Sequence, residues 1–181
     1  RANPELSEDM TLIRALRDSN KPKLLSEDLP LFTAIVDDLF PGVTVPVNDY
    51  GDFMVAIKAE IAKMGLQPQE NFITKVIEQF DVFNVRFGAT IVGPTGAGKT
   101  MCYRILAAAM GNLREQGHES ELYQKVEITV INPKCITMGE LYGEFNALTQ
   151  EWTDGIASSM IRTAVTLTGQ SDDYQWVVFD G

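Results

Sequence analysis

The sequence predicts an α/β fold in which a parallel sheet with crossover helices follows an α-helical segment. Two patterns lead to this prediction. In the first half, apolar residues recur at intervals of three and four, as they do on helices that bury one face. In the second half, short apolar runs typical of strands alternate with helical segments, and this order is typical of parallel sheets connected by helices.

Length and composition indicate a folded protein. The 181 residues fit one ordinary domain, or an incomplete domain with a piece of its neighbour. Hydrophobic residues make up 45% and charged residues 22%, as in soluble folded proteins. The net charge of −10, without a basic cluster, argues against nucleic acid and anionic membranes as partners. Because the chain begins with Arg and stops as an apolar strand ends, we expect a piece of a longer chain.

The cellular compartment follows from the cysteines and from the hydropathy of the chain. No apolar run approaches the roughly 20 residues that cross a bilayer, and the first ten residues do not have a signal-peptide or transit-peptide composition. Cys102 and Cys135 are expected to be reduced thiols of a cytosolic protein rather than a disulfide.

Four helices are expected before residue 85. The first follows Ser7 and ends near Asn20. The second, capped by Ser26 or Asp28, ends at "FPGV", residues 40–43, because proline cannot continue a helix. Asn48 or Asp49 caps the third, which Gly65 closes. Pro68 opens the fourth at its first helical position.

The second half alternates between the two kinds of element. Strands are expected at residues 86–92, at 125–131 and at the final apolar run "WVVFD". Helices are expected from Lys99 to about residue 113 and after the capping box "TMGE", where the helix buries Leu141, Phe145 and Leu148. The segment 152–168 fits neither pattern clearly.

A phosphate-binding loop lies between the first expected strand and the helix after it. Gly93, Gly98, Lys99 and Thr100 match G-x-x-x-x-G-K-[ST] position by position. Glycine at 93, 96 and 98 lets backbone N–H groups surround a phosphate chain. Lys99 supplies a positive charge toward the outer phosphates, and the Thr100 hydroxyl is the expected Mg²⁺ ligand.

An acidic residue at the end of the last strand would complete this site. Four apolar residues followed by Asp180 form the Walker B pattern, in which the aspartate holds the metal. Many P-loop ATPases of the AAA+ type carry next to it a glutamate that activates the attacking water. Here that position is Gly181, so we expect binding of MgATP with slow or no turnover, unless a base outside this stretch acts instead.

Other chemistry has little support in the sequence. His118 is the single histidine, which excludes a His-rich metal site, and it lies in a polar loop. Neither a G-x-S-x-G motif nor a zinc-ligand spacing occurs in the chain. Trp152 and Trp176 are interpreted as core or interface residues rather than as stacking platforms.

Taken together, the motifs resemble one family. The stretches "LRDSNKPKLLSEDLPLFTAIVDDLFPGV", "GPTGAGKT", "NPKCITMGELYGEFNALTQEWTDGI" and "WVVFDG" are similar to dynein heavy chains, and most similar to the second of their six AAA+ modules. The resemblance implies the α/β fold of a P-loop NTPase of the AAA+ type, here incomplete. It implies that residues 1–42 close the preceding module and lead across, and that residues 43–181 are the front part of the nucleotide-binding domain, ending at Walker B.

The resemblance also implies ligands and site residues. The ligands are ATP and Mg²⁺, with Thr100 and Asp180 on the metal, and no catalytic residue is assigned within this stretch. Residues expected at the nucleotide are, on the phosphate side, Gly93, Pro94, Thr95, Gly96, Ala97, Gly98, Lys99, Thr100 and Asp180, and, near the adenine, Leu39, Phe40, Pro41, Gly42 and Val43.

The family is a microtubule motor driven by ATP. This sequence resembles its axonemal members more than its cytoplasmic ones. The implied partners are neighbouring AAA+ modules of the same heavy chain. Microtubules and the intermediate and light chains would be contacted only through other parts of the chain, and nucleic acid and membranes are not expected partners. The implied location is the cytoplasm and cytoskeleton, in the axoneme of a cilium or flagellum.

Three other functions remain open from the sequence. The first is an active ATPase module whose catalytic base lies outside this stretch. The second is a structural module whose P-loop holds no nucleotide. The third is a small-molecule kinase or GTPase. It is the weakest alternative, because "NKPK" is not the N-K-x-D motif with which GTPases recognise guanine.

Overall fold

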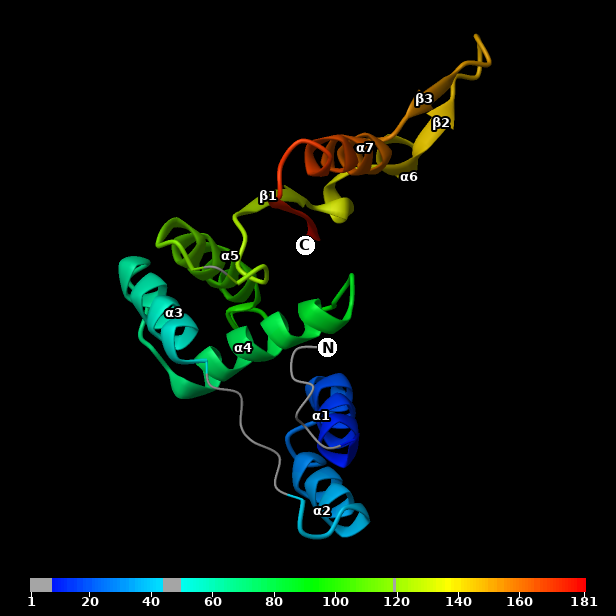
Figure 1. Cartoon of the computed structure of the whole chain (residues 1–181). Coiled ribbons are helices and arrows are strands. Elements are labelled where there is room, and N and C mark those ends of the chain that lie inside the picture. Colours follow the sequence, from blue (N-terminus) through cyan, green and yellow to red (C-terminus); the bar gives the residue numbers. More distant parts are fainter. Residues whose placement is uncertain (1–7, 44–49, 119) are drawn as a thin grey trace.

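The computed structural model describes residues 8–43, 50–118 and 120–181. Its first part contains α1 (Glu8–Asn20), η1 (Lys21–Lys23), α2 (Leu29–Leu39), α3 (Gly51–Lys63), α4 (Glu70–Val85) and α5 (Lys99–Glu115). Its second part contains β1 (Val126–Ile131), η2 (Pro133–Cys135), α6 (Met138–Tyr142), β2 (Gly143–Phe145), β3 (Trp152–Asp154), α7 (Ile156–Thr168) and β4 (Tyr174–Phe179). Figure 1 shows α1 and α2 at one end, α3 to α5 in the middle and the β2–β3 hairpin at the other end.

The main core lies between α3, α4 and α5. Apolar side chains recur every three or four residues on these helices, so each helix has one face to bury against the others. Phe53 of α3 contacts Phe80 of α4, with 4.7 Å between the ring centroids. The largest fully buried side chains of this core are Phe53, Ile57, Ile61, Ile73, Val76, Ile105 and Leu106.

The helix boundaries agree with the sequence in outline and differ in their caps. α2 ends at Leu39, before the proline, as predicted. Its N-cap is Asp28, but the Asp28 side chain makes no capping hydrogen bond, because its backbone is already helical (φ −86°, ψ −18°). α4 begins at Glu70, two residues after Pro68, so that prediction was wrong by half a turn.

Some predicted caps fall outside the described residues. Ser7, Asn48 and Asp49 belong to these positions, and the structure places Tyr50 at the N-cap of α3. The predicted end of α3 is confirmed, since Gly65 has a φ of 72° and the next amide, Leu66 N–H, bonds back to Ile61 O over 3.0 Å.

The parallel pairing predicted for the second half is confirmed between two strands. β1 and β4 run parallel, with Val126 opposite Tyr174 at one end and Ile131 opposite Phe179 at the other. α7 is the crossover helix that precedes β4 and packs against it. The carboxyl ends of both strands therefore lie side by side, and Asp180 N–H donates to Ile131 O over 3.0 Å.

The strand predicted at residues 86–92 was wrong. Within the described part of the chain this segment has no strand assignment, because β1 and β4 pair with each other and neither pairs with it. A strand needs a neighbouring strand to satisfy its backbone groups. Phe87 and Val92 accordingly remain exposed, although their apolar character suited a buried strand.

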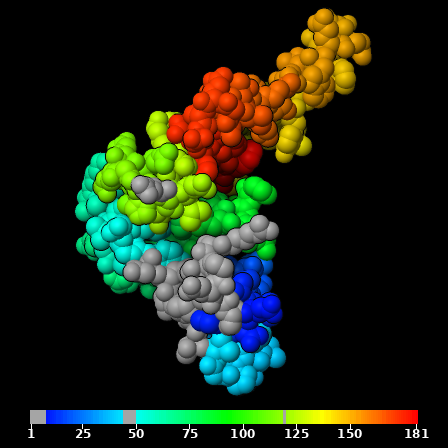
Figure 2. All heavy atoms as spheres, viewed as in Figure 1, coloured from blue at the N-terminus to red at the C-terminus, as the bar shows by residue number. Residues whose placement is uncertain are grey.

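The helix after the capping box is shorter than predicted. The capping box itself is confirmed: the Thr137 side chain accepts from Glu140 N–H, and the Glu140 side chain accepts from Thr137 N–H. Gly143, with a φ of 106°, ends α6 after five residues, and β2 then pairs with β3 in an antiparallel hairpin. Phe145 and Leu148 are therefore exposed instead of buried, and Figure 2 shows the hairpin projecting from the body of the molecule.

Two further observations concern thiols and membranes. Cys102 and Cys135 are free cysteines, the first buried in α5 and the second exposed after β1. Burial raises the pKa of the Cys102 thiol to about 11, so this thiol stays protonated and unreactive at neutral pH. None of the helices in the described ranges is long and apolar enough to cross a membrane.

Candidate functional site

The loop 93–98 leads directly into α5, and its backbone depends on glycine. Gly96 and Gly98 have φ values of 82° and 81°, in the left-handed region that favours glycine. Gly98 is also the N-cap of α5, and a Cβ atom there would lie 3.2 Å from the Phe72 ring of α4. The first N–H groups of α5 have no acceptor within the helix, so the loop presents them at the positive end of the helix dipole.

Lys99 folds back over this loop. Its Nζ donates to Gly93 O over 2.9 Å and to Pro94 O over 2.8 Å. Both acceptors are neutral carbonyl groups of the loop. A phosphate group placed over the loop would therefore meet an ammonium group whose charge is not neutralised by a carboxylate at these two contacts.

Thr100 and Asp180 lie together, although 80 residues separate them. Thr100 Oγ1 donates to Asp180 Oδ2 over 2.8 Å. Thr100 lies in the first turn of α5, and Asp180 directly follows β4. The two side chains that the sequence predicts for Mg²⁺ are thus adjacent beside the loop 93–98.

Tyr103 is a third member of this cluster that sequence reasoning missed. Its hydroxyl donates to the same Asp180 Oδ2 over 3.1 Å, and the residue is only 4% exposed. Burial raises the pKa of Tyr103, and the hydrogen bond to Asp180 raises it further, so the phenol remains a donor at neutral pH. The spacing of three residues from Thr100 places both on one face of α5, a signal that could have found it.

Asn132 is the fourth polar side chain here, and it was also missed. It follows β1 directly, as Asp180 follows β4, and parallel strands bring such positions to one edge of the sheet. Its side chain accepts from Lys134 N–H over 3.0 Å and lies against Gly181.

These groups fit a magnesium-bound nucleotide. Hydroxyl and carboxylate oxygens are the ligands that Mg²⁺ prefers, and it usually takes only one or two from the protein, with the rest from phosphates and water. Groups of three or more potential His, Cys, Asp or Glu ligands do not occur among the residues that the structure describes. Thr100 and Asp180 would hold the metal, and the loop and Lys99 would hold the phosphates, whose charge the metal would help to neutralise.

Replacing Tyr103 with phenylalanine tests whether it positions Asp180. The ring and its packing remain, and only the hydrogen bond to Asp180 is lost. We expect MgATP affinity to fall by about 3- to 10-fold, as for one lost hydrogen bond, and the half-saturating Mg²⁺ concentration to rise. A magnesium titration of nucleotide binding measures this, and Tyr142→Phe on an exposed tyrosine is the matched control. An unchanged titration would show that the Tyr103 hydroxyl does not serve the metal site.

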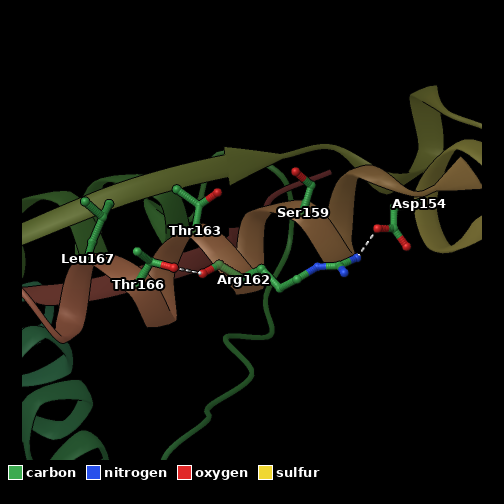
Figure 3. A pocket seen from close by; sticks show the side chains of 6 residues that line it. All are labelled: Asp154, Ser159, Arg162, Thr163, Thr166 and Leu167. Carbon is green, nitrogen blue, oxygen red and sulfur yellow. Dashed lines mark hydrogen bonds and ion pairs between the residues drawn. The ribbon is translucent and has the colours of Figure 1, made fainter.

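A separate hollow of about 430 Å³ lies along α7 (Figure 3). Its walls are side chains of α7 together with Asp154, which pairs with Arg162. None of the cluster around Asp180 lines it. The hollow therefore does not contribute to the candidate site, which rests on the loop and the strand ends. The lining residues are Asp154, Ser159, Arg162, Thr163, Thr166 and Leu167.

The adenine-side residues stay a prediction. Leu39 to Val43 lie at the end of α2, which Figure 1 shows apart from α5. Gly42 has a φ of 77°, consistent with the predicted turn after the helix.

Comparison with known proteins points to one family. A family model described as "Hydrolytic ATP binding site of dynein motor region" matches residues 1–100, a range that ends with Lys99 and Thr100. The chain is 50% identical over 181 residues to dynein axonemal heavy chain 6 of Homo sapiens and 48% identical over 182 residues to dynein axonemal heavy chain 1 of Homo sapiens. It is 42% identical over 181 residues to the Chlamydomonas reinhardtii protein "Dynein-1-beta heavy chain, flagellar inner arm I1 complex".

These alignments cover very different fractions of this chain and of its relatives. Each of the three covers 100% of this chain but only 4% of the relative. The chain thus spans a small part of the length of the curated relatives that it matches.

Proposed function

Because the chain belongs to the dynein heavy chain family, we propose that this part of it is an AAA+ module that binds MgATP with little or no hydrolysis. The observation that carries the proposal is the contact between Thr100 and Asp180 beside the loop, with Gly181 next in sequence. A metal site with both expected protein ligands supports binding. A residue without a side chain at 181 supports weak turnover, since it cannot take a proton from water.

The wider context of the chain is part of the same proposal. Residues 1–42 would close the preceding module, and residues 43–181 would form the front part of the nucleotide-binding domain. The module would support the ring of a microtubule motor and relay conformational changes between neighbouring modules. The axonemal relatives support a location in the axoneme of a cilium or flagellum.

An active ATPase module is the second candidate. The family description, which speaks of a hydrolytic site, favours it. That match covers residues 1–100, however, and so leaves out Asp180 and Gly181, where the capacity for hydrolysis would be decided. Hydrolysis here would need a base supplied from outside this stretch.

Replacing Thr100 with alanine tests the metal assignment. The loop and Lys99 remain, so we expect nucleotide binding to persist but to lose most of its dependence on Mg²⁺. Nucleotide binding measured over a range of Mg²⁺ concentrations reports this, with Thr100→Ser, which keeps the hydroxyl, as the control. If the alanine variant kept the magnesium dependence of the wild type, Thr100 would not be a metal ligand.

The identity of the retained nucleotide tests the proposed function. The intact heavy chain would be incubated with MgATP, freed of excess nucleotide and denatured, alongside its Lys99→Ala variant. Subtracting the nucleotide retained by the variant from that retained by the unmodified chain gives the nucleotide held at this site. We expect this difference to be about one ATP per chain. ADP would favour the active module, and no difference would favour a structural module with an empty loop.

A further inference from the structure

The loop 93–98 contacts a side chain that comes from another helix. A Cβ atom built on Gly98 would lie 3.2 Å from Cε2 and 3.6 Å from Cδ2 of Phe72, which belongs to α4. The edge of the Phe72 ring therefore occupies the side of Gly98 on which any other residue would carry its side chain. This contact depends on the way in which α4 packs against α5, the helix that follows the loop.

Gly98 is the residue at which the loop becomes a helix. Its φ of 81° lies in the left-handed region, and its C=O accepts from Cys102 N–H over 2.8 Å at the start of α5. Ala97 N–H donates to Pro94 O over 3.2 Å, which closes the loop. Residues 93–97 are exposed, whereas Gly98 is partly buried. Because an exposed loop gains conformational entropy when it opens, a contact that fixes Gly98 favours the closed form.

The core of the molecule holds Phe72 in place. Ile73 and Val76 follow it on α4 and are 1% and 0% exposed, as part of the core that α4 shares with α3 and α5. Phe72 itself is partly buried and packs against this core. Rotation of α4 would disturb the close packing of Ile73 and Val76. The helix therefore presents the Phe72 ring to Gly98 from a fixed position.

We propose that Phe72 is a positioning residue, which holds the loop 93–98 in its nucleotide-binding form before a nucleotide arrives. The inference rests on the proposed function in one respect, namely that this loop binds a nucleotide. The Phe72 side chain has neither a charge nor a hydrogen-bonding group, so it acts through Gly98. Loss of the ring lowers the fraction of chains whose loop is in the binding form, and the apparent affinity falls in proportion to that fraction.

Nucleotide affinity tests this role through its pattern across ligands. In the intact heavy chain, Phe72→Ala should weaken ATP and ADP binding at this site by the same factor, about 5- to 10-fold, because both ligands need the same form of the loop. The binding that remains in the matching Lys99→Ala chain is subtracted, so that other nucleotide sites of the heavy chain do not contribute. An affinity within about twofold of the wild type, or a loss more than about threefold larger for ATP than for ADP, would overturn the proposal.

Hydrogen exchange of the nucleotide-free heavy chain tests the loop itself. The reporters are Ala97 N–H and Cys102 N–H, which donate to Pro94 O and Gly98 O. We expect Phe72→Ala to speed exchange at both amides at least about fivefold, because the loop opens more often without the ring. Unchanged exchange would overturn the proposal, since the loop would then keep its form without Phe72.

A phenylalanine at the other end of α4 is the matched control. Phe83 lies in the last turn of the helix, is partly buried against the same core, and meets the Trp176 ring at 4.8 Å between centroids. Phe83→Ala removes the same ring from the same helix, so we expect nucleotide affinity and loop exchange within about twofold of the wild type. Equal effects of the two variants would show a general loosening of α4 and would overturn the proposal.

A second variant, Phe72→Leu, guards against failure of the alanine variant to fold. Leucine keeps an apolar side chain in the core but has no ring edge to place on Gly98, so ATP and ADP binding should still weaken equally, at least about threefold. Affinities equal to those of the wild type would overturn the proposal. If the unmodified chain bound no more nucleotide than its Lys99→Ala variant, the proposed function would fail, whereas exchange at Ala97 and Cys102 would still decide the role of Phe72.

Discussion

Replacing Lys99 with alanine is expected to weaken ATP binding by about 10- to 100-fold. The variant removes an ammonium group that now donates to Gly93 O and Pro94 O and that is free of a carboxylate at these contacts. A phosphate bound over the loop would replace the neutral carbonyl groups as the acceptor, and a hydrogen bond between charged groups is stronger than one to a carbonyl. Equilibrium binding of ATP to the intact heavy chain measures the change.

The control for this prediction is a lysine outside the loop. Lys58 lies on α3 and is paired with Glu70 at 3.7 Å on the surface. Lys58→Ala removes the same charge from the chain and should leave ATP affinity within about twofold, because exposed ion pairs contribute little. If Lys99→Ala bound ATP as tightly as Lys58→Ala, the assignment of the loop to the phosphates would be wrong.

Replacing Phe53 with alanine is expected to destabilise the helical core by about 3 to 5 kcal/mol. Phe53 is 1% exposed, and its ring lies 4.7 Å from that of Phe80 and 5.4 Å from that of Tyr123. The lost ring would leave a cavity between α3 and α4 that these neighbours only partly fill. Hydrogen exchange of the amides in α3, α4 and α5 should accelerate on the order of 100-fold or more.

An exposed residue of the same helix is the control for the core. Val55 is 67% exposed on α3, so Val55→Ala should change exchange in the three helices by no more than a few-fold. If Phe53→Ala behaved like Val55→Ala, the three helices would not share the core described here.

Features that depend on short stretches of sequence could be predicted. The glycine-rich loop before Lys99 and the capping box at Thr137 each depend on residues within one turn of one another, and both appear where the sequence placed them. The helices of the core were recognised by the same local logic, since burial of one face follows from the spacing of apolar residues.

Features that depend on distant pairing were missed or predicted wrongly. The run 86–92 has the composition of a strand, but whether it forms one depends on a neighbour that its own letters do not specify. The β2–β3 hairpin was missed because Phe145 also continues the helical spacing from Leu141, and only Gly143 breaks it. Apolar spacing alone therefore assigned a helix where the backbone turns into a strand.

The residues of the candidate site also differ in whether the sequence could predict them. Asp180 was predicted from the strand that precedes it, and its contact with Thr100 follows from the parallel order of strands and helices. The hydrogen bond from Tyr103 could have been expected from its place on α5. The contact between Asn132 and Gly181 could not, because it depends on the register of β1 against β4.

The most direct measurement is electron cryo-microscopy of the intact heavy chain in the presence of MgATP, at a resolution that separates the phosphates in the loop 93–98. We expect three phosphates on this loop, with a metal ion beside Thr100 and Asp180. Two phosphates, with the third released, would contradict a module that binds ATP without splitting it.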